Sequence, residues 1–154
     1  MRWISVPDPA QKSADKRMNS KKKERLKVKD TVLLHSADRD LTKSLSILLQ
    51  DRFDIVTTET AEELSNQRAN ACVKLLVVDL ERSIPLLLDE FELRRAQNAD
   101  APIIVLYAFR QGKPEWESRI RSLANKVLYK PVQIDQILDA IEIEHESQKI
   151  SGGG

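Results

Sequence analysis

The sequence predicts an α/β domain built on a five-stranded parallel sheet. Short apolar segments alternate with segments of helical periodicity from residue 31 to about residue 146. The most apolar segment, Lys74-Leu-Leu-Val-Val-Asp79, is typical of a strand buried on both faces. Regular alternation of strand and helix favours parallel strands joined by right-handed crossovers.

The composition fits one globular domain. The chain has 154 residues, of which 41% are hydrophobic and 32% charged. Its single cysteine, Cys72, excludes an internal disulfide, and apolar neighbours predict a buried, inert thiol. No apolar run approaches the ~20 residues that span a bilayer, and no signal-peptide core is present. We therefore expect a cytoplasmic protein.

Charge is distributed unevenly along the chain. Residues 1–29 carry ten Lys or Arg and three Asp or Glu, a net charge of +7. Residues 30–154 carry 15 basic and 21 acidic residues, a net charge of −6. Because residues 1–29 lack sustained periodicity, we expect a disordered or partly helical extension. After this extension we expect a domain over residues 30–147 and a flexible tail over residues 148–154.

The first two strands and helices are predicted over residues 31–69. Residues 31–35 form a short buried strand, and N-cap candidates precede a helix over about 39–51. Residues 53–57 alternate in polarity, which favours an edge strand. Thr60 and Glu63 have capping-box spacing and begin a helix that runs to about residue 69.

The third and fourth strands are also predicted to be buried. After the strand at 73–79, Pro85 suits the first turn of a helix that runs to about residue 97. The fourth strand, 102–107, begins with a proline, where the lost backbone donor matters least.

The last elements are a helix at about 115–124, a very short strand at 127–129 closed by Lys130-Pro131, and an amphipathic helix at about 133–146. Five such strands suit a flavodoxin-like, doubly wound sheet in the order 2-1-3-4-5, with the site at the switch point between strands 1 and 3. This arrangement places residues 35–38, 79–81, 107–108 and Lys130 at one end of the sheet.

The sequence shows no residue pattern typical of an enzyme active site. His35 is expected to be a satisfied core histidine rather than a donor to Asp79, and His145 an exposed helix-end residue. No glycine-rich phosphate loop is present, so we expect no enzyme. Binding of a flavin phosphate is disfavoured because Asp38 and Asp40 occupy the first strand-to-helix turn.

Over roughly residues 31–146 the chain resembles the receiver domain of two-component response regulators. The resemblance depends on the strand-terminal Asp79, on the segment 102–108, and on Lys130-Pro131 about fifty residues after Asp79. It implies that Asp79 is the phosphoacceptor, that Lys130 contacts the phosphoryl group, and that the Lys-Pro peptide is cis. It also implies a Mg²⁺ ion held by Asp79, by an acidic pair after the first strand and by the backbone carbonyl of Glu81.

Several positions depart from the family pattern. Ser36 and Ala37 stand where the acidic pair is expected, which leaves a weak Mg²⁺ site unless Asp38 is recruited by a shifted turn. The switch Ser or Thr is replaced by Tyr107, followed by Ala108.

Three further positions depart in the same way. The switch aromatic is replaced by Val127, with an aromatic two residues later at Tyr129. Ser83 and Leu87 replace a proline and a glycine of the loop after the acceptor.

These departures predict a pseudo-receiver that acts by protein–protein interaction, with weak or absent phosphorylation. Its expected partner is a histidine kinase or another signalling protein, with homodimerisation also open. The expected partner face includes Trp116, Arg119 and Tyr129, although an aromatic at the helical spacing of Trp116 is more often a core residue.

Two alternatives stay open. One is a conventional phosphorelay regulator phosphorylated on Asp79, in which Asp38 or Asp40 repairs the metal site. The other is a nucleic-acid-associated regulator that acts through the basic arm. In the absence of a metal, the Asp79–Lys130 pair would be a structural ion pair.

Overall fold

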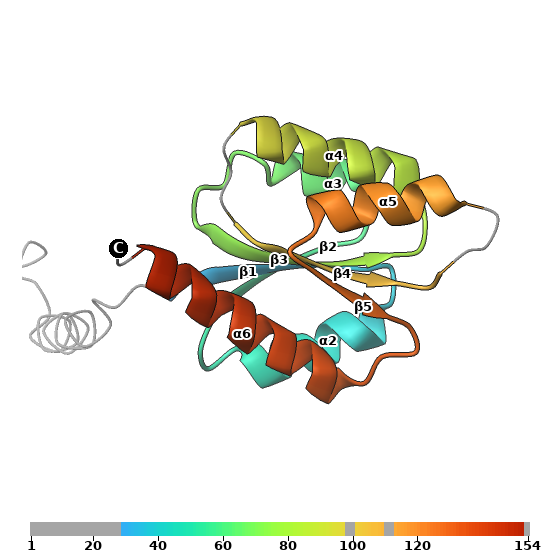
Figure 1. The fold of residues 1–154 in the computed structure, drawn as a ribbon. Coiled ribbons are helices and arrows are strands. Elements are labelled where there is room, and N and C mark those ends of the chain that lie inside the picture. Colours follow the sequence, from blue (N-terminus) through green and yellow to red (C-terminus); the bar gives the residue numbers. More distant parts are fainter. Residues whose placement is uncertain (1–28, 98–100, 110–112, 153–154) are drawn as a thin grey trace, which may run out of the picture.

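The computed structural model describes residues 29–97, 101–109 and 113–152, and these form a single α/β sandwich (Figure 1). All neighbouring strands are parallel, in the order β2-β1-β3-β4-β5. The predicted flavodoxin-like fold and strand order are therefore confirmed. The strands are β1 (Thr31–His35), β2 (Asp54–Thr58), β3 (Val73–Leu80), β4 (Ile103–Tyr107) and β5 (Lys126–Tyr129). The helices are α2 (Arg39–Leu49), α3 (Ala61–Asn66), α4 (Ile84–Ala96), α5 (Pro114–Leu123) and α6 (Ile134–Gly152).

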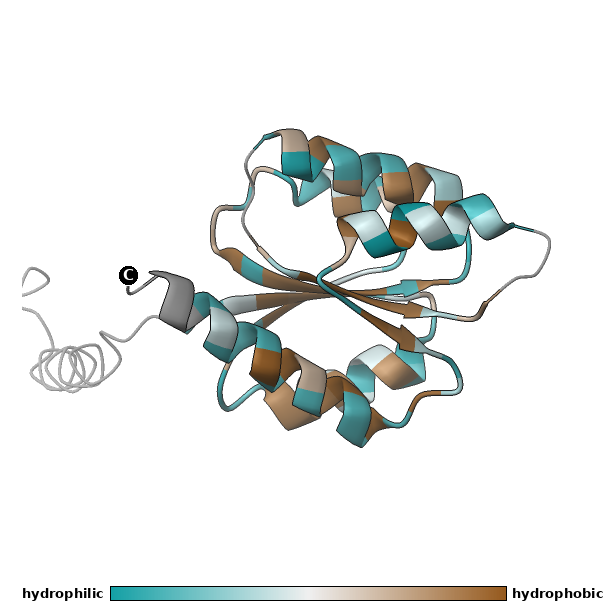
Figure 2. Cartoon of the chain, in the orientation of Figure 1, coloured by the Kyte–Doolittle hydropathy of each residue, from teal (hydrophilic) through white to brown (hydrophobic). Residues whose placement is uncertain are grey.

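Two helical layers cover the sheet. Helices α2 and α6 lie on one face, and α3, α4 and α5 lie on the other (Figure 1). Side chains of a strand alternate between faces, so β3 contributes to both cores. Leu75 and Val77 pack with α2 and α6, whereas Leu76 and Val78 pack with α3, α4 and α5. The central part of the sheet is accordingly mostly hydrophobic (Figure 2).

The predicted helix starts agree with the structure. The carboxylate of Asp38 caps α2 by accepting a hydrogen bond from the backbone N–H of Leu41 at 3.1 Å. Thr60 and Glu63 form both hydrogen bonds of a capping box at the start of α3. Pro85 lies in the first turn of α4, where its missing N–H leaves no helical bond unmade.

A buried ion cluster joins α3 to α4. Glu90 and Arg94, one turn apart on α4, are bonded at 3.2 Å, and Arg68 after α3 pairs with the same carboxylate. Arg94 also donates to the Leu64 carbonyl at 3.0 Å. Burial lowers the pKa of Arg94, and the Glu90 charge opposes this effect. The Glu90 carboxylate therefore compensates the positive charges of both Arg68 and Arg94.

Two predictions about single residues are wrong. His145 is buried rather than exposed, because α6 continues to Gly152 and places it on the same inward stripe as Ile137 and Ile141. Cys72 is exposed rather than buried, because β3 begins only at Val73 and Cys72 belongs to the preceding turn.

The chain ends were predicted as an extension and a tail. Residues 1–28 of the basic extension and residues 153–154 of the tail lie outside the described residues. Helix α6 includes residues 148–152, which were expected to belong to the tail. Among the helices of the described ranges, none combines the length and apolar character that crossing a membrane requires.

Candidate functional site

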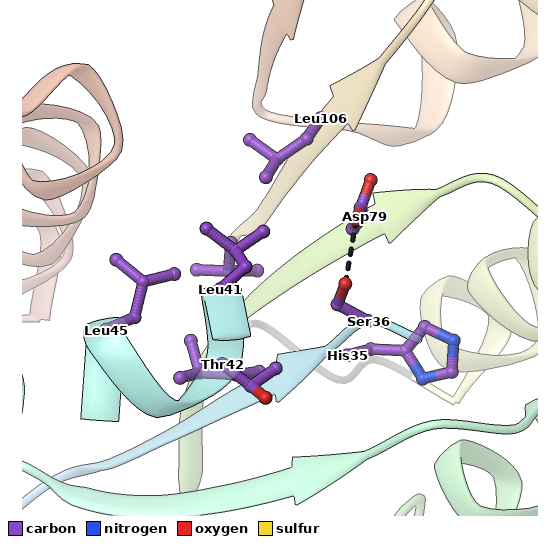
Figure 3. A pocket seen from close by; sticks show the side chains of 9 residues that line it. His35, Ser36, Leu41, Thr42, Leu45, Asp79 and Leu106 are labelled. Atoms are coloured by element: carbon purple, nitrogen blue, oxygen red, sulfur yellow. Dashed lines mark hydrogen bonds between the residues drawn. The ribbon is translucent and has the colours of Figure 1, made fainter. Parts of the chain in front are cut away.

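Asp79 lies at the carboxyl end of β3, and both of its carboxylate oxygens are engaged. The hydroxyl of Ser36 donates to Asp79 Oδ2 at 2.7 Å (Figure 3). The ammonium group of Lys130 forms an ion pair with Asp79 Oδ1. The Asp79 side chain is only 3% exposed, whereas that of Lys130 is 24% exposed. The buried negative charge is therefore compensated within the chain itself.

Neighbouring strand ends hold the two partners of Asp79 in place. Ser36 directly follows β1, and its backbone N–H donates to the Thr58 carbonyl at the end of β2 at 3.0 Å. The Ser36 hydroxyl oxygen also accepts from the backbone N–H of Asp38 at 3.0 Å. Lys130 directly follows β5, and its backbone N–H donates to the Tyr107 carbonyl at 2.9 Å. The Lys130-Pro131 peptide is cis, as the resemblance implies.

Tyr107 lies on the opposite side of the sheet from Asp79. In the register of β3 and β4, Asp79 is paired with Leu106, and Leu80 is paired with Tyr107. Tyr107 and Leu80 belong to the core beneath α3, α4 and α5, where Tyr107 is fully buried. Leu106 instead lines the space beside Asp79 (Figure 3). On the face of the sheet that carries Asp79, the neighbouring side chain of β4 is therefore the aliphatic Leu106. Ala108, which follows β4, is exposed.

The hollow next to Asp79 and Ser36 is small and mainly apolar. It is enclosed by β1, β3, β4 and α2, with a volume of about 10 Å³. Most of its wall consists of aliphatic side chains, which belong to Leu34, Leu41, Leu45, Val77 and Leu106. A space of this size accommodates about one water molecule. It leaves no room beneath Asp79 for a hydrated cation.

The residues at the metal positions do not fit Mg²⁺. Asp38 uses its Oδ1 to cap α2, so its carboxylate is held at the start of that helix. Ser36 and Ala37 supply no carboxylate, and Lys130 already neutralises Asp79. Among the described side chains, no group of three His, Cys, Asp or Glu residues could hold a metal ion. Magnesium favours carboxylates and waters in octahedral geometry, and these residues do not supply such a ligand set.

Glu81 contributes a second acid near Lys130. Its carboxylate Oε1 lies 3.9 Å from Lys130 Nζ, and its side chain is 54% exposed. The resemblance assigned Glu81 only through its backbone carbonyl, so the proximity of its side chain is an additional feature. Lys130 consequently lies between a buried carboxylate and a solvent-facing one.

His35 is a satisfied core histidine, as predicted. Its Nδ1 is 2.8 Å from the Thr58 hydroxyl, and the ring is directed away from Asp79 (Figure 3). Burial lowers the pKa of His35, and the charges of Asp79 and Glu63 oppose this shift. The neutral imidazole is therefore favoured in the folded state.

The three residues expected on the partner face have different surroundings. Trp116 is partly buried against the core beneath α3, α4 and α5. Arg119 donates to Asp89 and Glu92 of α4 at 3.0 and 2.8 Å. Tyr129 is 39% exposed. Of the three, Tyr129 therefore presents an exposed ring whose hydroxyl is bonded to neighbouring side chains.

Tyr129 belongs to a small polar cluster that links β5 to α5. Its hydroxyl donates to Glu117, and Arg121 donates to the Tyr129 oxygen and to Glu117, each at 2.9 Å. The hydrogen bond to Glu117 raises the pKa of Tyr129, which keeps the phenol protonated. We call Glu117, Arg121 and Tyr129 the β5 cluster.

Sequence reasoning did not identify the role of Ser36. It treated this position as a missing carboxylate, whereas its hydroxyl is the closest described partner of Asp79 Oδ2. The available signal was a small hydroxyl residue directly after a buried strand that adjoins the strand of Asp79. Such a residue can donate a hydrogen bond where an acid can only accept or repel.

Comparison with known proteins identifies the fold. No protein-family model and no curated protein sequence matches the chain. Among solved structures, a receiver domain of response regulator 1452 from Francisella is 18% identical, with a TM-score of 0.65 over 77% of this chain and 98% of that one. A response regulator receiver protein from Pseudomonas putida is 24% identical, with a TM-score of 0.63 over 75% and 97%.

An adenylate cyclase from Rhodopirellula baltica is also similar, at 17% identity and a TM-score of 0.68 over 82% of this chain and 94% of that one. Other solved structures of similar fold include a signal receiver domain from Vibrio parahaemolyticus and a chemotaxis protein from Vibrio cholerae. The chain therefore has the fold of response-regulator receiver domains.

Proposed function

We propose that the chain is a receiver-like signalling module that acts by binding a protein partner, with phosphorylation of Asp79 weak or absent. One observation carries the proposal: Ser36 and Lys130 engage both oxygens of Asp79. In this arrangement, the carboxylate serves as a structural link between the ends of β1, β3 and β5. The receiver fold supports a role in signal transduction, with a histidine kinase or another signalling protein as partner.

Two features of the site disfavour phosphorylation of Asp79. A carboxylate that attacks a phosphoryl donor needs a free lone pair, and the Ser36 hydrogen bond and the Lys130 ion pair both lower its nucleophilicity. Phosphoryl transfer also depends on cations that neutralise charge developing on the phosphoryl oxygens. Lys130 supplies one such charge, but it is already paired with Asp79. Of the nearby carboxylates, that of Asp38 caps α2 and that of Glu81 faces solvent 3.9 Å from Lys130, so a divalent ion would have to recruit one of them.

Chemical phosphorylation tests this proposal. The full chain is incubated with acetyl phosphate and Mg²⁺, and intact-protein and peptide mass spectrometry are used to look for a phosphoryl adduct on Asp79. Asp79→Asn is the matched control because it keeps the size of the side chain. We expect no adduct beyond that of the control. A stoichiometric, Mg²⁺-dependent adduct on Asp79 would refute the proposal.

The competing function is a conventional aspartyl-phosphate switch. It is favoured by the contact between Lys130 and Asp79, which agrees with the phosphoryl-contacting role that the resemblance gives to this lysine. It would require Asp38 to leave its capping position, or Glu81 to turn towards Asp79. The variants Asp38→Ala and Glu81→Gln test this requirement. Loss of Mg²⁺-dependent phosphorylation of Asp79 in either variant would support the switch.

The β5 cluster is the surface that we propose for the partner. It combines an exposed aromatic ring with a guanidinium and a carboxylate, which are side chains that can make directional contacts across an interface. Tyr129→Ala should reduce recovery of the partner from a lysate of the source organism severalfold, while Asp79→Asn should leave it unchanged. Binding that appears only after treatment with beryllofluoride would instead favour the phosphorylation switch.

A further inference from the structure

The outer face of α6 carries an acidic stripe around one exposed apolar side chain. Asp139, Glu142, Ile143 and Glu146 follow one another at spacings of three, one and three residues, so they share one side of the helix. Ile143 is 63% exposed. These four residues and Ser147 line a shallow hollow of about 420 Å³. We call the four residues the α6 stripe.

Most of the negative charge on this stripe is uncompensated. Glu142 accepts a hydrogen bond from Arg52 at 2.6 Å. Among residues 29–97, 101–109 and 113–148, whose side chains the structure describes, none forms an ion pair with Asp139 or Glu146. An exposed isoleucine beside two unpaired carboxylates suits a ligand with both apolar and basic side chains.

The basic extension joins the domain next to this stripe. Asp30 Oδ2 is 2.8 Å from Nε2 of His145 on α6, and Lys29 Nζ donates to the Gln50 carbonyl at 3.1 Å. Arg52, which contacts the stripe through Glu142, lies two residues after Gln50. The chain therefore enters the described domain between the end of α2 and the second half of α6.

The residues that immediately precede this point have complementary chemistry. Residues 21–28 read Lys-Lys-Lys-Glu-Arg-Leu-Lys-Val, with five basic side chains, one acid and two apolar residues. The stripe from Asp139 to Glu146 is about 10 Å long at 1.5 Å rise per residue. Eight extended residues reach up to roughly 28 Å. The segment is therefore long enough to cover the stripe of its own molecule.

We propose that residues 21–28 dock on the α6 stripe of the same molecule. Basic side chains of the segment pair with Asp139 and Glu146, and an apolar side chain covers Ile143. The docked segment covers the acidic side of α6. This inference is independent of the phosphorylation state of Asp79.

Paramagnetic broadening in the full chain tests the contact. A nitroxide is attached at Ser147→Cys in a Cys72→Ser background, because Cys72 is exposed and would also react. Amide signals of residues 17–27 are recorded with the label oxidised and reduced. The test variant is Asp139→Lys/Glu146→Lys. The matched control, Glu62→Lys/Glu115→Lys, makes the same change in net charge on α3 and α5.

We expect strong broadening of residues 21–27, reduced severalfold by the α6 double variant and retained by the control. Raising the salt from about 0.1 M to about 1 M shortens the Debye length from about 10 Å to about 3 Å and should also reduce the broadening. Broadening that is unchanged by the α6 double variant would overturn the proposal, since tethering alone would explain it. A mixed sample, in which one copy carries the nitroxide and another carries the isotope, reports contacts between molecules. Broadening in that sample equal to the broadening in the singly labelled chain would also overturn the proposal, in favour of docking between two molecules.

Discussion

Ser36 donates a hydrogen bond to Asp79 across the boundary between β1 and β3, at 2.7 Å between the two side-chain oxygens. The bond is buried, and the same hydroxyl accepts from the backbone N–H of Asp38. A hydroxyl in this position stabilises the Asp79 charge without a metal ion, whereas a carboxylate would repel it. The relationship accounts for a retained acid in a site whose other acids are missing.

Restoring the acidic pair should create a metal requirement. Ser36→Asp/Ala37→Asp places carboxylates beside Asp79, so without Mg²⁺ the variant should be less stable than the wild type because like charges repel. Added Mg²⁺ should then raise its stability, by about 2.7 kcal/mol at a hundredfold excess over Kd. Thermal unfolding with and without Mg²⁺ measures this effect. Ser36→Asn/Ala37→Asn is the uncharged control, and an equal response to Mg²⁺ in both variants would contradict the prediction.

The Lys130–Asp79 pair should be strongly coupled. Lys130→Met leaves a buried carboxylate without its cation and should cost about 3 kcal/mol of unfolding free energy. This value is at the lower end for a buried pair because the lysine side chain is 24% exposed. Combining Lys130→Met with Asp79→Asn should cost less than the sum of the two single changes. Urea unfolding of all four proteins measures the coupling, and simple additivity would mean that the ion pair stabilises little.

Ser83 should tolerate replacement by glycine better than most loop residues. It precedes α4 with φ of 54° and ψ of 36°, a left-handed conformation that disfavours side chains with a Cβ atom. Its side chain makes no capping hydrogen bond to α4. Ser83→Gly should therefore raise the unfolding free energy by about 0.5–1 kcal/mol. Ser83→Ala keeps the Cβ atom and should show no such gain in the same assay.

His35 should make stability fall on mild acidification. Burial lowers its pKa in the folded protein below the ordinary value of about 6.5. The unfolded chain therefore takes up a proton more readily, and stability is lost as pH decreases below about 6.5 towards the lowered pKa. His35→Gln keeps a polar group near Thr58 and should flatten the stability profile between pH 7.5 and 5.5 relative to the wild type. Parallel profiles would show that His35 does not titrate differently in the two states.

The fold was predictable because its signals are local. The apolar run ending at Asp79, the caps at Asp38 and Thr60, and Pro85 each specify an element within a few residues. Cys72 and His145 were predicted wrongly because their burial depends on where β3 begins and where α6 ends. The contact between His145 and Asp30 joins residues that are 115 positions apart in the sequence, so no local pattern reveals it.

The site was predictable only in part. Asp79 and Lys130 were expected together because the ends of parallel strands meet at one edge of the sheet, and the structure brings them into contact. The direction of the Tyr107 side chain depends on the strand register, which places it in the opposite core from Asp79. The Ser36 hydrogen bond depends on a side-chain torsion, and no sequence pattern specifies it.

A Mg²⁺ titration with and without beryllofluoride, a phosphoryl mimic, tests the central claim most directly. Backbone amide shifts of Ser36, Asp79, Glu81 and Lys130 are followed in isotope-enriched full-length protein. The account predicts that neither Mg²⁺ alone nor Mg²⁺ with beryllofluoride shifts these signals in the millimolar range, because Asp79 already accepts a hydrogen bond from Ser36 and forms an ion pair with Lys130. Saturable shifts at these residues with Mg²⁺ and beryllofluoride, absent in Asp79→Asn, would show a working phosphoacceptor site and contradict the account.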